Sequence, residues 1–334
     1  MKLSLLDQLH ISPGQSSQQA LADTITLSRH LETLGFARHW IVEHHGVPYE
    51  ICADPMLMAL ALAQSTQTIR IGVGGILLNN YSPYKVAETA KTLSLLAPGR
   101  IDIGIGQSNS GELQDLALQT DRLHKPQHDQ ADKTDELLGH LFADLPADHR
   151  FHQLKIIPDA APPMPWVMAV SAASAARAGA AGLPLALSAF HRPQEAIATA
   201  QAYRRAFRPS MRPGLPQSPK LFLAIRLCCA ATQAEAEARA MPFRWAFDQR
   251  RRLGKMPMAL PSIAQSIKLA GGVWPAETDP WPMYVIAAFR DIRGLLLRMA
   301  EAVGTDEIMV QDALPDPQMR RDHYAELADE ISKG

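Results

Sequence analysis

Cysteine is scarce in this sequence, and the residues present indicate neither a disulfide framework nor structural zinc. Cys52, Cys228 and Cys229 are odd in number, include an adjacent pair and lack Cys-x-x-Cys spacing. Long apolar runs are also lacking, since no stretch approaches the roughly 18 uncharged apolar residues of a membrane span. The first apolar run stops at Asp7, too early for a signal sequence. We therefore expect a cytoplasmic protein with no membrane segment.

An excess of charge of either sign is missing too. The chain has 33 Lys and Arg against 34 Asp and Glu, which gives a formal net charge of −1. Such a balance provides no electrostatic attraction to nucleic acid or to an anionic membrane, so neither is expected as a partner. The 334 residues are 47% hydrophobic and 20% charged. This composition is typical of a globular protein, and the length suits one α/β barrel with insertions.

Short apolar runs alternate with helical patterns along the whole chain. Several runs are almost continuously apolar, which is typical of parallel strands covered on both faces. Eight strand–helix alternations favour right-handed crossovers and closure into a (β/α)₈ TIM barrel, with residues 1–334 as a single domain. The predicted strands are Lys2–Asp7, His39–Glu43, Ile69–Ile76, Ile101–Gly106, Trp166–Ser171, Leu185–Phe190, Lys220–Cys228 and Glu307–Gln311. The predicted helices are Gln18–Leu34, Asp54–Ser65, Pro83–Leu96, Ala131–Phe142, Ala172–Ala181, Pro193–Phe207, Gln233–Gln249, Pro282–Val303 and Asp316–Ile331.

Three segments interrupt this alternation. Gln107–Gln130 is a polar insertion after the fourth strand, and Leu253–Pro282 is an insertion after the seventh, rich in Pro, Gly and Met. Segments of this length are typical of lids over a site or of disordered excursions. Arg208–Pro219 contains four prolines and reads as a stiff surface connection. An open doubly wound sheet is the alternative architecture, but no G-x-G-x-x-G or G-x-x-x-x-G-K motif follows any strand.

Polar residues and glycines collect where the predicted strands end, which is where α/β barrels have their active sites. His44 follows the second strand and could donate or accept a proton near neutral pH; a loop histidine bonded to backbone is an equal alternative. Gly74 and Gly75 end the third strand, where they permit either the close approach of a flat ring or a simple turn. The remaining strand ends contribute Asp7-Gln8, Gly106-Gln107, Ser171 with Ser174, His191 and Arg226.

The segment Ser171–Ser174 joins the fifth strand to its helix. Two hydroxyls and free N–H groups at a helix N-terminus suit a phosphate, although an ordinary serine N-cap has the same appearance. The triplet Glu43-His44-His45 is a poor metal site, because neighbours on extended backbone point to opposite faces. Aromatic and methionine residues around Pro242–Met258 could line a lid, with core packing as the default interpretation.

Taken together, these motifs resemble the bacterial-luciferase-like, flavin-dependent monooxygenases. The resemblance is dense over residues 1–106 and patchy over 160–310, and it depends on the order and spacing of the motifs. The matching stretches are Leu6-Asp7-Gln8, Leu34–Trp40, Glu43-His44-His45, Ile69–Gly75, Ser82-Pro83, Val86-Ala87-Glu88 and Pro98–Gly106, with weaker matches at Trp166–Leu183 and Asp306–Val310.

The resemblance implies a TIM barrel, usually dimeric, that uses reduced FMN from a separate flavin reductase, with O₂ and a small organic molecule as substrates. The deazaflavin F420 is the alternative cofactor. His44 would be the catalytic residue, beside the reactive edge of the ring. Gly74-Gly75 matches a non-proline cis peptide that supports the ring. Gly106 would lie against the ring, and Ser171 and Ser174 would hold the phosphate.

The sequence departs from the family pattern on the phosphate side. Gln107 stands where family members commonly have an arginine, and an amide lacks the bidentate, charge-assisted grip of a guanidinium on a dianion. Ala169-Val170 replaces a Gly-Ser pair ahead of the phosphate serine, and Ser108–Gly111 replaces an Ala-Pro-Gly stretch. Gln107 and Val170 therefore join the predicted cofactor-binding residues, and no metal ligand is predicted.

Three functions remain open from the sequence. The leading one is an FMN-dependent monooxygenase or oxidoreductase, and the second is a weakened flavin-binding or partner subunit with the same fold. The third is a metal-dependent hydrolase that uses His44, His45 or His191 with a carboxylate, an option that the fold alone does not support.

Overall fold

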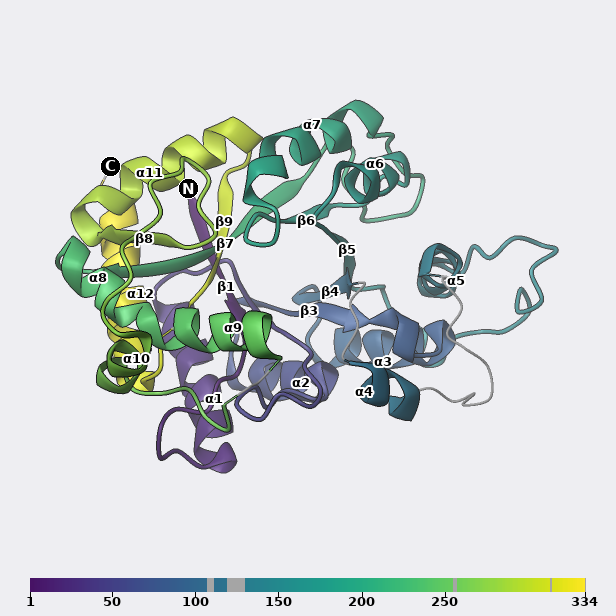
Figure 1. Cartoon of the computed structure of the whole chain (residues 1–334). Coiled ribbons are helices and arrows are strands. Elements are labelled where there is room, and N and C mark those ends of the chain that lie inside the picture. The colour runs from purple at the N-terminus through teal and green to yellow at the C-terminus, as the bar shows by residue number, and fades with distance from the viewer. Residues whose placement is uncertain (107–110, 119–129, 255–256, 313, 334) are drawn as a thin grey trace.

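The computed structural model describes residues 1–106, 111–118, 130–254, 257–312 and 314–333. Eight parallel strands pair in a closed ring, because β6 and β7 join the two ends of the sequential order and β9 returns beside β1 (Figure 1). The predicted TIM barrel is therefore confirmed. The ring strands are β1 (Lys2–Asp7), β2 (Arg38–Ile41), β3 (Arg70–Leu77), β4 (Ile101–Gly106), β5 (Met164–Ala169), β6 (Leu185–Ser188), β7 (Leu221–Ala230) and β9 (Glu307–Gln311).

Helices cover the outside of the ring, and the helices α8, α9 and α10 gather on one side with β8 (Figure 1). Among the described residues, none of the helices combines the length and the apolar character needed to cross a bilayer. The helices are α1 (Ser17–Thr33), α2 (Pro55–Ser65), α3 (Pro83–Leu96), α4 (Glu112–Leu118), α5 (Gln130–Phe142), α6 (Ala172–Ala180), α7 (Ala196–Ala206), α8 (Gln233–Arg239), α9 (Met241–Leu253), α10 (Ile263–Ala270), α11 (Phe289–Val303) and α12 (Pro317–Ser332), with short 3₁₀ turns at Leu78–Asn80 and Pro193–Glu195.

Helix boundaries follow local chemistry. Ser16 caps α1 and forms a reciprocal capping box with Gln19, while Asp54 and Ser82 cap α2 and α3, each followed by a proline in the first turn. Gly304 ends α11 in the left-handed conformation that glycine adopts readily. These signals explain why most predicted helices agree with the structure to within a few residues.

The predicted helix Pro282–Val303 is wrong at its start. Residues Val285–Ala288 form a ninth strand, β8, which pairs with the extension of β7 beyond the ring. All four residues of β8 are buried and apolar, and in the sequence they run directly into the apolar residues of α11. The boundary between the strand and the helix therefore leaves no mark in the sequence pattern. The predicted helix Gln233–Gln249 is also two helices, because Pro242 cannot continue α8 and instead begins α9.

Several predicted strand ends lie too far along the chain. β2 ends at Ile41 rather than Glu43, β5 runs from Met164 to Ala169, and β6 ends at Ser188. Glu43, His44 and Ser171 are therefore loop residues just past a strand. Within the two predicted insertions the structure contains α4 and α10, and the long segment before β8 is thus partly helical.

Alternate residues of each strand point into the barrel and form layers. The middle layer is aromatic: the Trp40 ring lies 6.0 Å from that of Trp166 and 5.1 Å from that of Phe222, both nearly perpendicular to it. This layer fills the barrel centre, so the interior is a core rather than a channel. A ligand must therefore bind at one of the barrel's two ends.

The layer at the amino ends of the strands consists of paired charges. Arg38 donates to Asp102 at 2.6 Å and to Glu307 at 2.6 Å, and Ser4 donates to the same Glu307 at 2.7 Å. Arg70 also pairs with Asp102. Burial favours the neutral form of Asp102, but the two guanidinium groups outweigh it and lower the pKa of its carboxyl.

Candidate functional site

The residues predicted for the site lie at the carboxyl ends of the strands, hereafter the carboxyl rim: the ends of β1–β7 and β9 with the loops that follow them. Ile41 is level with Val73, Leu77 with Gly106, and Ala169 with Leu187. His44, Gly74, Gly75, Gly106 and the serines after β5 therefore share this end of the barrel. The structure thus brings together the described residues that sequence reasoning selected.

The peptide bond between Gly74 and Gly75 is cis, as the family resemblance implies. A Cβ atom on Gly75 would lie 2.6 Å from the Gly104 carbonyl oxygen and 2.6 Å from the Met168 sulfur. A Cβ atom on Gly74 would lie 2.7 Å from Leu6. Close packing inside the barrel therefore demands glycine at both positions.

Gly106 differs from these two glycines. A Cβ atom built on it would meet its nearest neighbour, the Ile76 carbonyl oxygen, at 3.6 Å, which is ordinary van der Waals contact. Its φ angle is not positive either. Neither the packing of the described residues nor the backbone conformation requires glycine here, and a glycine of this kind leaves room for a ligand to approach.

His44 is part of a polar cluster built from two loops. Its Nε2 lies 3.3 Å from Glu50 Oε2, and the other oxygen of Glu50 lies 3.6 Å from His10 Nε2. An antiparallel bridge between residues 10 and 50 holds the loops after β1 and β2 together. Loss of water around the ring lowers the pKa of His44 despite the opposing charge of Glu50. The imidazole is therefore neutral at pH 7 and can accept a proton.

The unpaired nitrogen of this histidine is the one not facing Glu50. His44 Nδ1 has no hydrogen-bond partner within the described part of the chain, and its backbone N–H donates to the Cys52 carbonyl. The side chain is 22% exposed, so the ring is held by protein yet accessible from the rim. With Nε2–H directed at the carboxylate, the lone pair would lie on Nδ1, which is buried.

Glu43 and His45 have a structural role instead. Glu43 is buried and accepts from the Leu77 backbone N–H at 2.9 Å, the Tyr81 hydroxyl at 2.8 Å and the His45 ring at 2.7 Å. These bonds attach the loop after β2 to the end of β3. They fix the backbone on both sides of His44 relative to the end of β3.

The serines after β5 lie at the first turn of α6. Ser171 caps the helix by accepting from the Ser174 backbone N–H at 3.3 Å, and the two hydroxyl oxygens are 3.1 Å apart. Both side chains are at least partly exposed, so they are accessible to an anion at the helix N-terminus. Val170 precedes them by one residue. Gln107 lies outside the described residues.

Sequence reasoning missed Glu50 and His10 as neighbours of His44. Neither residue has a distinctive neighbour in the sequence, and only the bridge between their loops brings them to His44. His191 and Arg226, which were noted at strand ends, do lie at the rim. Loss of surrounding water, together with the charge of Arg226, lowers the pKa of His191 to about 4.

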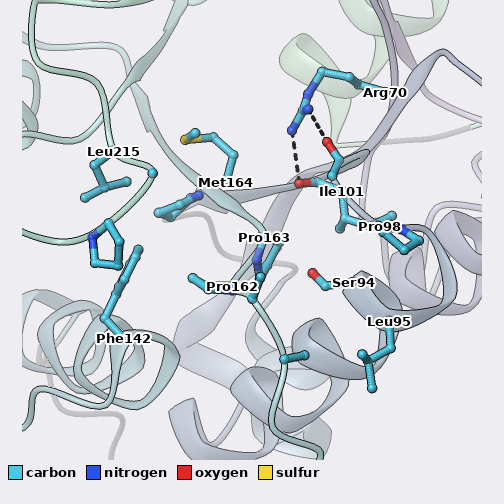
Figure 2. A pocket seen from close by; sticks show the side chains of 16 residues that line it. Arg70, Ser94, Leu95, Pro98, Ile101, Phe142, Pro162, Pro163, Met164 and Leu215 are labelled. Atoms are coloured by element: carbon cyan, nitrogen blue, oxygen red, sulfur yellow. Dashed lines mark hydrogen bonds between the residues drawn. The ribbon is translucent and has the colours of Figure 1, made fainter.

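A cavity of about 310 Å³ lies at the opposite end of the barrel. It is formed around the amino ends of β4 and β5, with Arg70, Ser94, Pro98, Phe142, Pro163 and Leu215 among its lining residues (Figure 2). The Arg70 guanidinium is already bonded to the carbonyls of Gly99 and Ile101 and to Asp102. The residues predicted for the site do not line this cavity. In barrel enzymes the residues at the amino ends of the strands serve stability, and the active site lies at the carboxyl ends. We therefore place the candidate site at the carboxyl rim.

Within the described residues, no three His, Cys, Asp or Glu side chains come together as a potential metal site.

Comparison with known proteins agrees with this geometry. A family model described as luciferase-like monooxygenase matches residues 1–266. The chain belongs to the luciferase-like monooxygenase family. An uncharacterised protein of Bacillus subtilis, YceB, is 31% identical over 333 residues, 98% of each chain. The N-acetyl-S-alkylcysteine monooxygenase of the same organism is 34% identical over 239 residues, 71% of this chain and 70% of that one.

Solved structures give the same result. Apo-MsnO8 is 31% identical, and the match covers 100% of this chain and 99% of the MsnO8 chain with a TM-score of 0.89. More distant structures share the fold alone. They include the oxygenating constituent of 3,6-diketocamphane monooxygenase with FMN (18% identity, 99% and 98% coverage, TM-score 0.70) and an F420-dependent secondary alcohol dehydrogenase (16% identity, 99% of each chain, TM-score 0.63). Family membership thus identifies this luciferase-like protein as an oxidoreductase.

Proposed function

We propose that this luciferase-like protein is an FMN-dependent monooxygenase that oxidises a small organic substrate at the carboxyl rim. The observation that carries the proposal is the placement of three features around one end of the barrel: the cis Gly74-Gly75 segment, Gly106, whose described surroundings do not require glycine, and the neutral His44. Together they provide a flat platform with a proton acceptor beside it.

The residues present fit a flavin. Gly106 leaves open the space that a Cβ atom would take, and His44 Nδ1 is a buried polar atom without a partner in the described residues. Gly74, Gly75 and Gly106 would hold the ring, while Ser171, Ser174 and the backbone at Val170 would hold the phosphate, with Gln107 completing that end. A bound reduced flavin would supply the activation of O₂.

The chain itself contributes positioning and proton transfer. Glu50, 3.3 Å from Nε2, holds the His44 imidazole in place, and the neutral ring, 22% exposed, would accept and return a proton at the rim. The bonds of Glu43 keep this loop from moving relative to β3. Positioned general bases of this kind contribute about 10²- to 10⁴-fold to a rate.

Further parts of the proposal concern partners. The reduced flavin would come from a separate reductase, and the active form would be a homodimer, as the family resemblance implies. F420 is the alternative cofactor, and a titration with both cofactors distinguishes the two.

The test is a titration of purified protein with oxidised FMN, reduced FMN and F420, followed by flavin oxidation assays. His44→Ala should lower turnover about 10²- to 10⁴-fold without reducing flavin affinity, while His45→Ala serves as the neighbouring control. Failure of wild-type protein to bind either flavin at concentrations on the order of tens of micromolar would contradict the proposal.

A second candidate function is a flavin-binding or partner subunit with weakened catalysis. It is favoured by Gln107, where the family commonly has arginine. Gln107→Arg should raise FMN affinity by roughly tenfold or more if the missing charge limits binding. An unchanged affinity in this variant would show that position 107 does not limit cofactor binding.

A further inference from the structure

Among the described residues, one buried arginine at the carboxyl rim lacks the carboxylate partner that the other buried arginines, Arg38 and Arg320, have. Arg226 is 5% exposed and points into the barrel, because it continues the inward-facing series of Phe222 and Ala224 on β7. It lies level with Gln311, the last residue of β9. Its charge is therefore at the bottom of the rim, directly above the aromatic middle layer.

The surroundings of Arg226 are aromatic. Its guanidinium carbon lies 4.8 Å from the ring centres of both Phe190 and Phe247, 5.2 Å from Tyr284 and 5.4 Å from Phe243. Cation–π contacts of this kind stabilise a cation but satisfy no N–H donor. The four rings therefore hold the side chain in place. Of their atoms only the Tyr284 hydroxyl oxygen can accept from the guanidinium, and this hydroxyl has no hydrogen bond of normal geometry within the described residues.

The donors of Arg226 are only partly used. Nε donates to Gln311 Oε1 at 2.9 Å, whereas Nη1 has no hydrogen-bond partner among the residues that the structure describes. No described carboxylate lies within ion-pair distance of it, while Arg38 pairs with Asp102 and Glu307. An unpaired buried donor on a charged group is expensive, so its retention indicates a ligand that completes it.

The charges around Arg226 are compatible with the binding of an anion to its guanidinium. Glu50, whose charge acts on Arg226, is already shared between His44 and His10, and Arg250 adds a further positive charge near it. Carboxylates bind guanidinium groups through paired, charge-assisted hydrogen bonds, and an apolar body next to the carboxylate would pack on the rings.

We propose that Arg226 is the anion-recognition residue of the substrate pocket, and that the substrate is a carboxylate with an apolar or aromatic body. This inference rests on the proposed function, because it assigns the substrate class of the same rim. The orphan Nη1 and the ring of four aromatic side chains are the observations that carry it.

Calorimetric titration of flavin-free protein tests the proposal, with benzoate and hexanoate as probes and with benzamide and hexanamide as their neutral counterparts. Wild-type protein should bind each carboxylate at least tenfold more tightly than its amide. Arg226→Met should abolish this preference, and Arg226→Lys should retain part of it. Arg226→Gln is a second uncharged variant to be used if circular dichroism shows that Arg226→Met does not fold.

Arg244→Met is the matched control. Arg244 also stacks on Tyr284, at 5.9 Å, but its guanidinium donates to the carbonyls of Trp274 and Pro275 at 2.7 and 2.9 Å. This variant should keep the preference for carboxylates. Equal binding of acid and amide by wild-type protein, or equal losses in the Arg244 and Arg226 variants, would overturn the proposal.

An oxyanion at Arg226 could also be the phosphate of the cofactor, and a comparison of FMN with riboflavin separates the two sources. If Arg226→Met lowers the affinity for FMN but not for riboflavin, the arginine binds the cofactor and the substrate proposal is wrong. Loss of all flavin binding by the wild type, with the carboxylate preference intact, would instead refute the proposed function alone.

Discussion

The two ends of the barrel differ in whether their buried charged and polar side chains have partners within the described residues. At the amino end, Arg38 has two carboxylate partners and Asp102 has two guanidinium partners. At the carboxyl rim, Arg226 has no carboxylate partner and His44 Nδ1 no hydrogen-bond partner within the described residues. Satisfied buried networks stabilise and specify a fold, whereas unsatisfied ones are retained where a ligand or a reaction needs them.

The difference teaches where to look for function in this molecule. A cavity of about 310 Å³ lies at the amino end, yet its arginine is engaged by Gly99, Ile101 and Asp102. The rim has polar side chains with atoms that lack partners in the described part of the chain, among them Arg226 on strand β7 and His44 on a well-held loop. These atoms of Arg226 and His44, together with the usual place of active sites in barrels, therefore identify the candidate site.

The largest expected effect comes from breaking the amino-end network. Asp102→Ala leaves Arg38 and Arg70 short of a buried partner and should destabilise the protein by about 3–5 kcal/mol. Asp144→Ala, which removes an exposed partner of Arg212, should change stability by less than about 1 kcal/mol. Urea denaturation measures both. Similar losses in the two variants would mean that the amino-end network is not the stabilising element.

Acid should weaken the two ends at different pH values. His323 on α12 is buried, accepts from the Cys229 backbone N–H of β7, and has its pKa lowered to about 4 by burial. This pKa lies below the ordinary 6.5. The contribution of neutral His323 to the free energy of unfolding is therefore complete above pH 6.5 and is lost as the pH falls towards 4. The loss should reach about 3 kcal/mol. The lowered pKa of Asp102 keeps the amino-end network charged until the pH falls below 3.8.

Unfolding free energies measured between pH 7 and pH 4 test this expectation. His323→Gln retains an acceptor for Cys229 and removes the titrating group, so the slope of stability against pH should flatten in that range. An unchanged slope in the variant would assign the acid sensitivity to other residues.

The smallest effect distinguishes two glycines of the same strand. A Cβ atom on Gly104 would lie 2.4 Å from the Val73 carbonyl oxygen, so Gly104→Ala should cost about 1–3 kcal/mol. The new Cβ atom of Gly106→Ala would meet no described atom closer than 3.6 Å, so this variant should keep its thermal stability nearly unchanged while binding flavin more weakly. If Gly106→Ala destabilises the fold as much as Gly104→Ala, position 106 is a packing glycine and not part of a ligand platform.

Repetition made the fold predictable from the sequence. The alternation of apolar runs and helical patterns needs only local periodicity, and capping residues such as Ser16 and Asp54 mark where helices begin. Val285–Ala288 was missed because a four-residue buried strand has no period of its own before an amphipathic helix. Pro242 could have divided the predicted helix, since proline cannot continue one.

The amino-acid sequence alone determined the barrel, the order of its strands, and the positions of His44, Gly74-Gly75, Gly106 and the serine pair, because strand ends and glycine doublets are local features. Only the tertiary structure decided that Glu50 and His10 reach His44, and that Arg226 sits among four aromatic rings without a described carboxylate. These relations depend on contacts between segments up to about 58 residues apart. Chain-distant contacts leave no periodic signal, so folding must bring them together before they can be recognised.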